Sequence, residues 1–212
     1  MLKVSEIFYS IQGESTFAGR PCAFVRLAGC NLRCSYCDTA YAYGEGTPLD
    51  IDAILERVLA FSCGLVEITG GEPLLQSETP KLAQRLLDNG LTVLVETNGS
   101  VDIDRLPGGV IRIMDVKCPG SGCVGANDWK NLERLRSTDQ VKWIITDRRD
   151  FDWAMELVRR HDLCRKVAVL FSPATGGLPQ DLLAKWILEE KLPIRLQLQL
   201  HKILWPGKDR GC

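Results

Sequence analysis

The sequence carries no excess of charge of either sign: 26 lysines and arginines stand against 27 aspartates and glutamates, for a formal net charge of −1. Without a basic field the chain has no general attraction for nucleic acids or for anionic lipid. It also lacks any apolar run approaching the roughly 20 residues that a membrane-spanning helix needs. We therefore expect neither a direct nucleic-acid partner nor a membrane partner.

Targeting and linker features are missing as well. Residues 1–6 hold no basic segment followed by an apolar one, so no secretory signal is expected. No repeat, low-complexity tract or linker interrupts the chain, and 45% hydrophobic with 25% charged residues is an ordinary globular composition. These absences predict a single cytoplasmic domain over residues 1–212, in a compartment that keeps thiols reduced.

Short β-branched and apolar runs alternate with amphipathic segments along most of the chain. Strands are predicted at residues 23–27, 65–69, 91–96, 110–116, 141–145, 166–171 and 194–200. Helices are predicted at residues 51–59, 79–89 and 182–187. This alternation is typical of α/β proteins with parallel strands joined by right-handed crossovers. About six units are too few for a closed barrel of eight, so a partial (open) parallel β/α barrel is predicted, with a doubly wound sheet as the alternative.

Cysteine is frequent for a chain in a reducing compartment. Nine cysteines occur, and Cys30, Cys34 and Cys37 share one loop, residues 28–40, after the strand at 23–27. Closely spaced thiols in such a compartment indicate a metal centre or catalysis rather than disulfides. The spacing C-x3-C-x2-C suits an iron–sulfur cluster with one iron left open. It also suits a zinc ion completed by Cys22, Asp38 or a distant thiol.

The cysteine loop resembles the signature of the radical S-adenosylmethionine (SAM) enzymes, in which an aromatic residue, here Tyr36, precedes the last cysteine. The segment Thr69-Gly70-Gly71-Glu72-Pro73 is similar to the one with which these enzymes bind SAM. The resemblance implies a 4Fe–4S cluster held by Cys30, Cys34 and Cys37, SAM on its fourth iron, and a barrel of the radical SAM type. It also implies a one-electron donor such as flavodoxin or ferredoxin.

Further positions match those at which the family contacts SAM. The resemblance assigns cofactor binding to Tyr36, Cys37, Asp38, Gly71, Glu72, Asn98, Asp115, Val116, Lys117 and Ser172. From the residues alone, two glycines let the backbone approach a ligand, and Glu72 can accept a hydrogen bond from an ammonium group. The same segments are also typical of an ordinary strand-to-helix turn and, at Asn98-Gly99, of an Asn-Gly turn.

A third set of motifs narrows the resemblance. Ile11-Gln12-Gly13-Glu14, Arg26, Cys37-Asp38-Thr39 and His201-Lys202 together resemble the 7-carboxy-7-deazaguanine synthase family, which are radical SAM lyases. That family contracts the ring of 6-carboxy-5,6,7,8-tetrahydropterin, with loss of ammonia, in queuosine and deazapurine biosynthesis and hence in a tRNA modification pathway. The implied substrate-binding residues are Ile11, Gln12, Gly13, Glu14, Arg26, Thr69, His201 and Cys212. Ser15 departs from the family pattern, which has glycine there.

Two more roles come with this resemblance. Thr39 is similar to the family's Mg²⁺ ligand, and its hydroxyl with oxygens of the substrate carboxylate suits the preference of magnesium for hard oxygen ligands. The alternative role of Thr39 is to cap the following turn. His201 and the terminal carboxylate of Cys212 are predicted to reach the polar edge of the pterin, which would make the tail at residues 205–212 a lid.

Two other functions compete with this one. A glycyl-radical-enzyme activase of the same superfamily shares the cysteine spacing, but the Gln12-Gly13-Glu14 segment and the lack of extra domains speak against it. A non-catalytic zinc-binding module would make the Gly-Gly-Glu-Pro segment a coincidence. The family also suggests a homodimer, for which Trp129, Trp143 and Trp153 are candidate interface residues.

Overall fold

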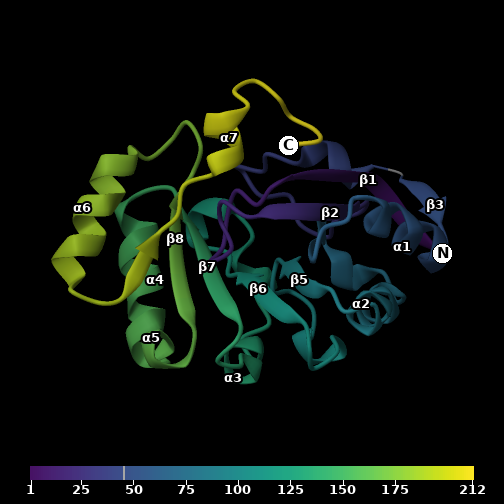
Figure 1. Cartoon of the computed structure of the whole chain (residues 1–212). Helices are drawn as coiled ribbons and strands as arrows, with labels where there is room; N and C mark the ends of the chain where they lie inside the picture. Colours follow the sequence, from purple (N-terminus) through teal and green to yellow (C-terminus); the bar gives the residue numbers. More distant parts are fainter. Residues whose placement is uncertain (45) are drawn as a thin grey trace.

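The computed structural model describes residues 1–44 and 46–212, and its strands join into one sheet (Figure 1). The strands are β1 (Leu2–Ile11), β2 (Pro21–Leu27), β3 (Thr47–Leu49), β4 (Leu65–Gly70), β5 (Thr92–Thr97), β6 (Ile111–Asp115), β7 (Gln140–Ile145), β8 (Ala168–Pro173) and β9 (Ile194–Leu196). Their order across the sheet is β3-β1-β2-β4-β5-β6-β7-β8-β9. The pairs from β2 to β9 are parallel, whereas β1 runs antiparallel to β2 and β3.

The strand order decides between the two predicted architectures. From β2 to β9 the order follows the sequence and never reverses, as it would at the switch point of a doubly wound sheet. Within the described residues the edge strands β3 and β9 do not pair with each other, so the barrel stays open. The predicted partial parallel barrel is confirmed, and the doubly wound alternative is wrong.

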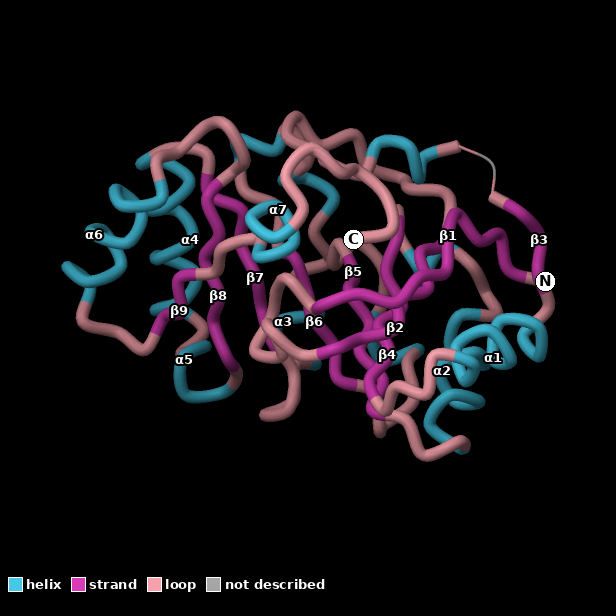
Figure 2. Tube along the Cα trace, turned by 45° about the horizontal axis from the view of Figure 1, so that its top comes forward, coloured by secondary structure: helices cyan, strands magenta, loops and turns pink. Residues whose placement is uncertain are grey.

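Most helices lie on the outer side of the sheet, and they gather at both ends of the molecule with the strands between them (Figure 2). They are α1 (Ile51–Ala60), α2 (Thr79–Asp88), α3 (Asn131–Arg134), α4 (Arg148–Arg160), α5 (Leu163–Lys166), α6 (Gln180–Glu190) and α7 (Leu200–Leu204). The first begins where expected, because the Asp50 side chain accepts a hydrogen bond from the Ala53 amide at 2.7 Å. Among the described helices none is both long and apolar enough to cross a membrane.

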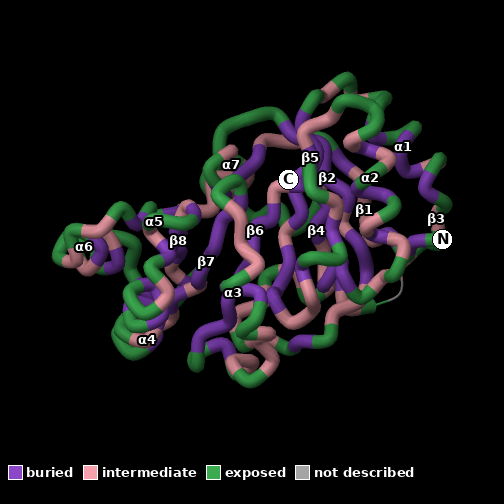
Figure 3. Tube along the Cα trace, turned by 90° about the horizontal axis from the view of Figure 1, so that it is seen from below, coloured by how far each residue is buried: buried purple, intermediate pink, exposed green. Residues whose placement is uncertain are grey.

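Apolar side chains fill both faces of the sheet. The outer face packs against the helices in a large core, and strands such as β4, β6 and β7 are buried along much of their length (Figure 3). A smaller apolar cluster, the interior plug, fills one end of the barrel interior and consists of Phe8, Cys22, Phe24, Leu65, Leu94 and Ile113. Since alternate residues of a strand share a face, the next inward positions after this plug are Arg26, Glu67, Glu96 and Asp115.

Three local expectations need correction. Residues 2–11 form β1, which the sequence does not predict because apolar and polar residues do not alternate regularly along it. The strand predicted at 194–200 ends at residue 196, where the chain turns toward α7. Trp143 is fully buried and packs edge-on against Phe171 with the ring centroids 5.6 Å apart, so it is no interface residue. Trp129 and Trp153 pack against each other nearer the surface.

Candidate active site

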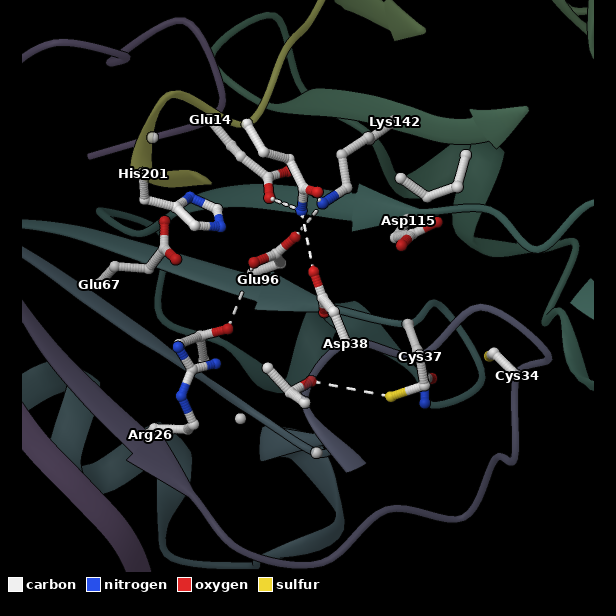
Figure 4. A pocket seen from close by; sticks show the side chains of 18 of the residues that line it. Glu14, Arg26, Cys34, Cys37, Asp38, Glu67, Glu96, Asp115, Lys142 and His201 are labelled. Atoms are coloured by element: carbon white, nitrogen blue, oxygen red, sulfur yellow. Dashed lines mark hydrogen bonds and ion pairs between the residues drawn. The ribbon is translucent and has the colours of Figure 1, made fainter. Parts of the chain in front are cut away.

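The barrel interior opens into a large cavity at the carboxyl ends of the parallel strands (Figure 4). The cavity holds about 1240 Å³ of space between atoms, its open mouth included. Its walls come from the cysteine loop, the ends of β4 to β7, the loop after β1, and the C-terminal segment.

One wall, the cysteine side, carries Cys30, Cys34 and Cys37, all of which line the cavity. The loop packs closely on the end of β4, where the Glu72 amide donates to the Gly29 carbonyl at 2.8 Å. A Cβ atom at Gly71 would lie 2.1 Å from that carbonyl oxygen, so this approach requires glycine. Gly71 of the Gly-Gly pair thus has a packing function beside the cysteine loop.

The three thiols lie on one loop and can bind the irons of a cluster. Every cysteine of the described chain is a free thiol, and the Leu32 amide donates to Cys30 Sγ at 3.4 Å. Over residues 1–44 and 46–212 no three His, Cys, Asp or Glu side chains converge closely enough to hold one metal ion. In a cubane cluster each cysteine binds a different iron, so the thiolates need not share one point. The donor set therefore fits an iron–sulfur cluster.

Beside the cysteines lie polar groups that are buried and incompletely bonded. Lys117 Nζ pairs with Asp115 Oδ2 at 2.8 Å; burial alone would lower the pKa of Lys117, but Asp115 outweighs it and the pKa is raised. In the described structure the Tyr36 hydroxyl and Asp115 Oδ1 are buried without any hydrogen-bond partner. Because buried polar atoms normally have partners, these atoms point to a polar ligand that enters between the cysteine loop and β6.

Three expected cofactor contacts do not line the cavity: Glu72, Val116 and Ser172. Glu72 is fully buried, and its carboxylate accepts hydrogen bonds from the Thr97 hydroxyl at 2.9 Å and the Asn98 amide at 2.6 Å. Burial raises its pKa. Its oxygens therefore hold the end of β5 in place, which leaves Asn98, rather than Glu72, at the cavity wall.

The opposite wall, the carboxylate side, is centred on Lys142 from β7. Lys142 Nζ binds Glu14 Oε2 at 2.8 Å and also pairs with Glu96 of β5 (Figure 4). Burial alone would lower the pKa of Lys142, but the two carboxylates hold it well above its usual value. Burial would raise the pKa of Glu14, yet Lys142 outweighs this and lowers it. Both groups are therefore charged at neutral pH.

The C-terminal segment joins the two walls. Gln199 Nε2 donates to Glu14 Oε1 at 2.9 Å and to Asp38 Oδ2 at 3.0 Å, and Lys202 Nζ binds the same Asp38 oxygen at 2.7 Å. Burial would raise the pKa of Asp38, but Lys202 and the Gln199 hydrogen bond lower it to about 2. Asp38 directly follows Cys37, so the segment before and within α7 ties the cysteine loop to the carboxylate side.

The tail closes over the mouth of the cavity. The Gly211 amide donates to Glu6 Oε2 at 3.1 Å, and Glu6 also binds Arg26 at 2.8 Å, which places Cys212 in the cavity lining. His201 packs against Gly13, where a Cβ atom would meet its Nδ1 at 2.3 Å. Burial lowers the pKa of His201.

The loop after β1 keeps the shape that a glycine would favour at Ser15. This residue has φ of 64°, in the left-handed region where glycine is preferred. Its amide donates to the Gln197 side chain at 2.6 Å, and its hydroxyl accepts from the Phe17 amide at 3.1 Å. Ser15 therefore adopts a backbone conformation that glycine would adopt without strain.

Most of the expected site residues meet in this cavity. Those that line it are Ile11, Gln12, Gly13, Glu14, Arg26, Cys30, Cys34, Tyr36, Cys37, Asp38, Thr39, Thr69, Gly71, Asn98, Asp115, Lys117, His201 and Cys212. Sequence reasoning missed Glu67, Glu96, Lys142 and Gln199. For the first three a signal existed, since a charged residue inside an apolar strand is rarely buried without a partner.

Known proteins match the chain along its whole length. The radical SAM superfamily profile matches residues 25–114. The 7-carboxy-7-deazaguanine synthase of Chlorobaculum tepidum is 47% identical and covers 99% of this chain and 97% of its own length. The protein of that name from Koribacter versatilis is 43% identical, covering 99% and 100%. The crystal structure of QueE from Escherichia coli, 21% identical, covers 92% of this chain and 93% of that chain with a TM-score of 0.75, which shows a shared fold.

Proposed function

Since this chain belongs to the 7-carboxy-7-deazaguanine synthase family of the radical SAM superfamily, we propose that it contracts the ring of 6-carboxy-5,6,7,8-tetrahydropterin to 7-carboxy-7-deazaguanine, with loss of ammonia. The observation that carries this proposal is one cavity with three free thiols on one wall and, on the other, the buried Lys142 paired with the half-buried Glu14 and Glu96. Neither a zinc-binding module nor a glycyl-radical-enzyme activase is favoured by the relatives.

Cys30, Cys34 and Cys37 would hold the 4Fe–4S cluster, and the unpartnered atoms of Tyr36 and Asp115 support SAM binding beside it. When bound, the cluster and SAM supply a radical that removes a hydrogen atom from the substrate. The chain itself excludes water and orients the substrate, which is the usual division of labour in cofactor enzymes. Lys202 keeps Asp38 ionised, so the Asp38 carboxylate would accept hydrogen bonds where SAM and the pterin lie side by side.

The substrate would lie toward the carboxylate side. Pterins present amino and ring N–H donors, and the ionised carboxylates of Glu14 and Glu96 are suitable acceptors for them. Arg26, beside Thr69 on the neighbouring strand, offers a cation to the substrate carboxylate. Because Lys142 and Gln199 already orient the Glu14 carboxylate, this side chain loses little conformational entropy when the substrate binds.

A Mg²⁺ ion bound by Thr39 is part of the proposal. Thr39 precedes a short helical turn but makes no capping hydrogen bond, and its hydroxyl lies 3.8 Å from Cys37 Sγ at the cavity wall. This leaves the hydroxyl oxygen available to a cation. With oxygens of the substrate carboxylate and water it would form a site of the kind magnesium prefers.

The remaining roles follow from the family. We propose a single domain over residues 1–212 that acts in the cytoplasm as a homodimer, takes electrons from a donor such as flavodoxin or ferredoxin, and feeds queuosine synthesis and thus tRNA modification. The test is anaerobic turnover by reconstituted protein with the pterin, SAM, Mg²⁺ and a one-electron reductant, read by mass spectrometry. We expect 7-carboxy-7-deazaguanine. Cleavage of SAM without this product would contradict the substrate, and protein that holds zinc without iron would contradict the whole proposal.

A further inference from the structure

One buried acid in the cavity has no part in the roles described so far. Glu67, on β4, is 4% exposed and lies on the carboxylate side together with Glu14 and Glu96 (Figure 4). In the described part of the chain its carboxyl group has one hydrogen-bond partner, the Gln12 amide, and forms no ion pair. Lys142 is engaged by Glu14 and Glu96 instead. A buried carboxyl group without a counter-ion is costly in its charged form.

The surroundings therefore favour the neutral form. Burial, reinforced by the nearby charges of Glu96 and Glu14, raises the pKa of Glu67 to about 8. The titratable and charged groups on the elements around it are Cys22 and Arg26 on β2, Glu96 on β5, Lys142 on β7, Glu14 in the loop after β1, and His201 on α7. At neutral pH the Glu67 carboxyl group is mainly an acid that carries a proton.

The hydrogen bonds identify the oxygen that carries this proton. Gln12 Oε1 accepts from the Glu14 amide at 3.0 Å, so Gln12 Nε2 is the donor toward Glu67 Oε2, at 2.5 Å. Because Oε2 is the acceptor, the proton belongs on Oε1. This oxygen makes no hydrogen bond within the described chain. It is not among the polar atoms that are both inaccessible to solvent and without a partner, so it is accessible from the cavity that Glu67 lines.

We propose that Glu67 is a specificity-determining residue that donates a hydrogen bond from its protonated carboxyl group to the oxo oxygen of the pterin's pyrimidine ring. The inference rests on the proposed function. The pyrimidine edge presents amino and N–H donors next to one oxo acceptor: Glu14 and Glu96 suit the donors, and the acceptor requires a donor from the protein. An ionised Glu67 would leave the oxo oxygen unpaired, and a site built on hydrogen bonds discriminates strongly against such mismatches.

The test is the dissociation constant of the pterin as a function of pH. It is measured anaerobically on cluster-loaded protein with SAM but without reductant, between about pH 6.5 and pH 9.5. For the wild type, the Kd is expected to be constant well below pH 8 and to rise about 10-fold per unit above it, as the acid loses its proton. Glu67→Gln keeps an N–H donor that does not titrate, so its Kd should stay constant across this range.

Cys22→Ala is the matched control, because the Cys22 thiol is a titratable neighbour of Glu67 on β2 and has its pKa raised by burial. It should keep the alkaline rise. The inference is overturned if Glu67→Gln keeps the rise, or if the wild-type Kd is constant to pH 9.5; the second result needs no variant. If the wild type makes product but shows no alkaline rise, only this inference fails, whereas a wild type without product contradicts the proposed function.

A substrate analogue tests the atom that is contacted. Replacing the oxo group by an amino group turns the acceptor into a donor, which suits the ionised form of Glu67 rather than the protonated form. The Kd of this analogue for the wild type should therefore fall as pH rises through about 8, the opposite of the pterin. A Kd that rises for both ligands would overturn the contact with the oxo oxygen.

Discussion

The two sides of the cavity are built in opposite ways. On the cysteine side, three thiols from one short loop face the cavity with few partners, and the Tyr36 hydroxyl and Asp115 Oδ1 nearby have none within the described structure. On the carboxylate side, the groups come from several distant elements and are already bound to one another, as in the pairing of Lys142 with Glu14.

This difference indicates what each side needs. Buried donors and acceptors without partners gain hydrogen bonds when a ligand binds, so the cysteine side depends on its cofactor. The carboxylate side is ordered before any ligand arrives, so it contributes to the stability of the fold and presents fixed groups to the substrate. A substitution on the cysteine side should therefore weaken cofactor binding, whereas a substitution on the carboxylate side should lower the stability of the fold.

The largest effect is expected from Cys34→Ala, which removes one of the three thiols proposed to hold the cluster. We predict loss of iron and of all turnover, while the free energy of unfolding of the cluster-free protein changes by less than about 1 kcal/mol. Iron content, turnover and denaturant unfolding measure these outcomes. Cys63→Ala is the control, because this half-buried thiol lies just before β4 outside the cavity lining. Full iron content in Cys34→Ala would contradict the assignment.

Lys142→Met should act on stability instead. It leaves the half-buried Glu14 and Glu96 without their shared, buried cation, and the cost has as its upper bound the about 3–5 kcal/mol of breaking a fully buried pair. The pKa of Glu14 is lowered in the folded protein, so the stability it contributes is present above its ordinary value of 4.5 and is lost as pH falls through the lowered pKa. The deficit of the variant should therefore shrink at acidic pH.

Denaturant unfolding at neutral and at acidic pH measures this deficit. Arg160→Met is the control, because Arg160 and Glu156 form an exposed pair on α4 that is worth about 1 kcal/mol or less. A Lys142→Met protein that is as stable as the wild type at neutral pH would show that the carboxylate side does not support the fold.

Thr39→Val tests the proposed Mg²⁺ site, which lies between the cysteine side and the carboxylate side. The valine side chain has a similar shape but no oxygen, so we expect Mg²⁺ affinity to fall on the order of 10–100-fold, the scale of lost support at a metal site. The measurement is turnover as a function of Mg²⁺ concentration. Thr39→Ser keeps the hydroxyl and should respond to Mg²⁺ as the wild type does. An unchanged Mg²⁺ response in the valine variant would remove Thr39 from the site.

The smallest effect is expected at the mouth. Deleting residues 209–212 removes the Gly211 hydrogen bond to Glu6 and the cavity contact of Cys212. We expect the substrate KM to rise about 10-fold, the scale of one lost charge-assisted hydrogen bond, with little change in kcat. Steady-state kinetics give both values, and an unchanged KM would contradict the role of the tail as a lid.

The grouping of the three thiols on the cysteine side could be predicted from the sequence because they lie within eight residues, Cys30 to Cys37, on one loop. The barrel was likewise predictable from the alternation of strands and helices. The carboxylate side was not, because Glu14 and Lys142 are 128 residues apart and meet only once the sheet has formed. Strand alternation shows that Lys142 faces inward, but it does not identify a partner.

Glu72 also has partners that its local motif does not predict. Its motif predicts a ligand contact, yet its oxygens are occupied by Thr97 and Asn98, which follow in the chain by 25 and 26 residues. The residues around Glu72 in the sequence do not indicate these hydrogen bonds, because the donors lie at the end of another strand. The local motif identified the region of the cavity, while a contact of Glu72 itself with the cofactor stays a prediction.

The most direct test of the division between the two sides is an anaerobic assay that follows SAM cleavage and ring-contracted product together, in the wild type and in Glu14→Gln. The wild type should form 7-carboxy-7-deazaguanine. The variant keeps its cysteine side and loses a charged substrate contact, so it should still cleave SAM while product formation falls at least about 10-fold. Product at the wild-type rate in Glu14→Gln, or loss of both activities in a folded, iron-loaded variant, would contradict the account.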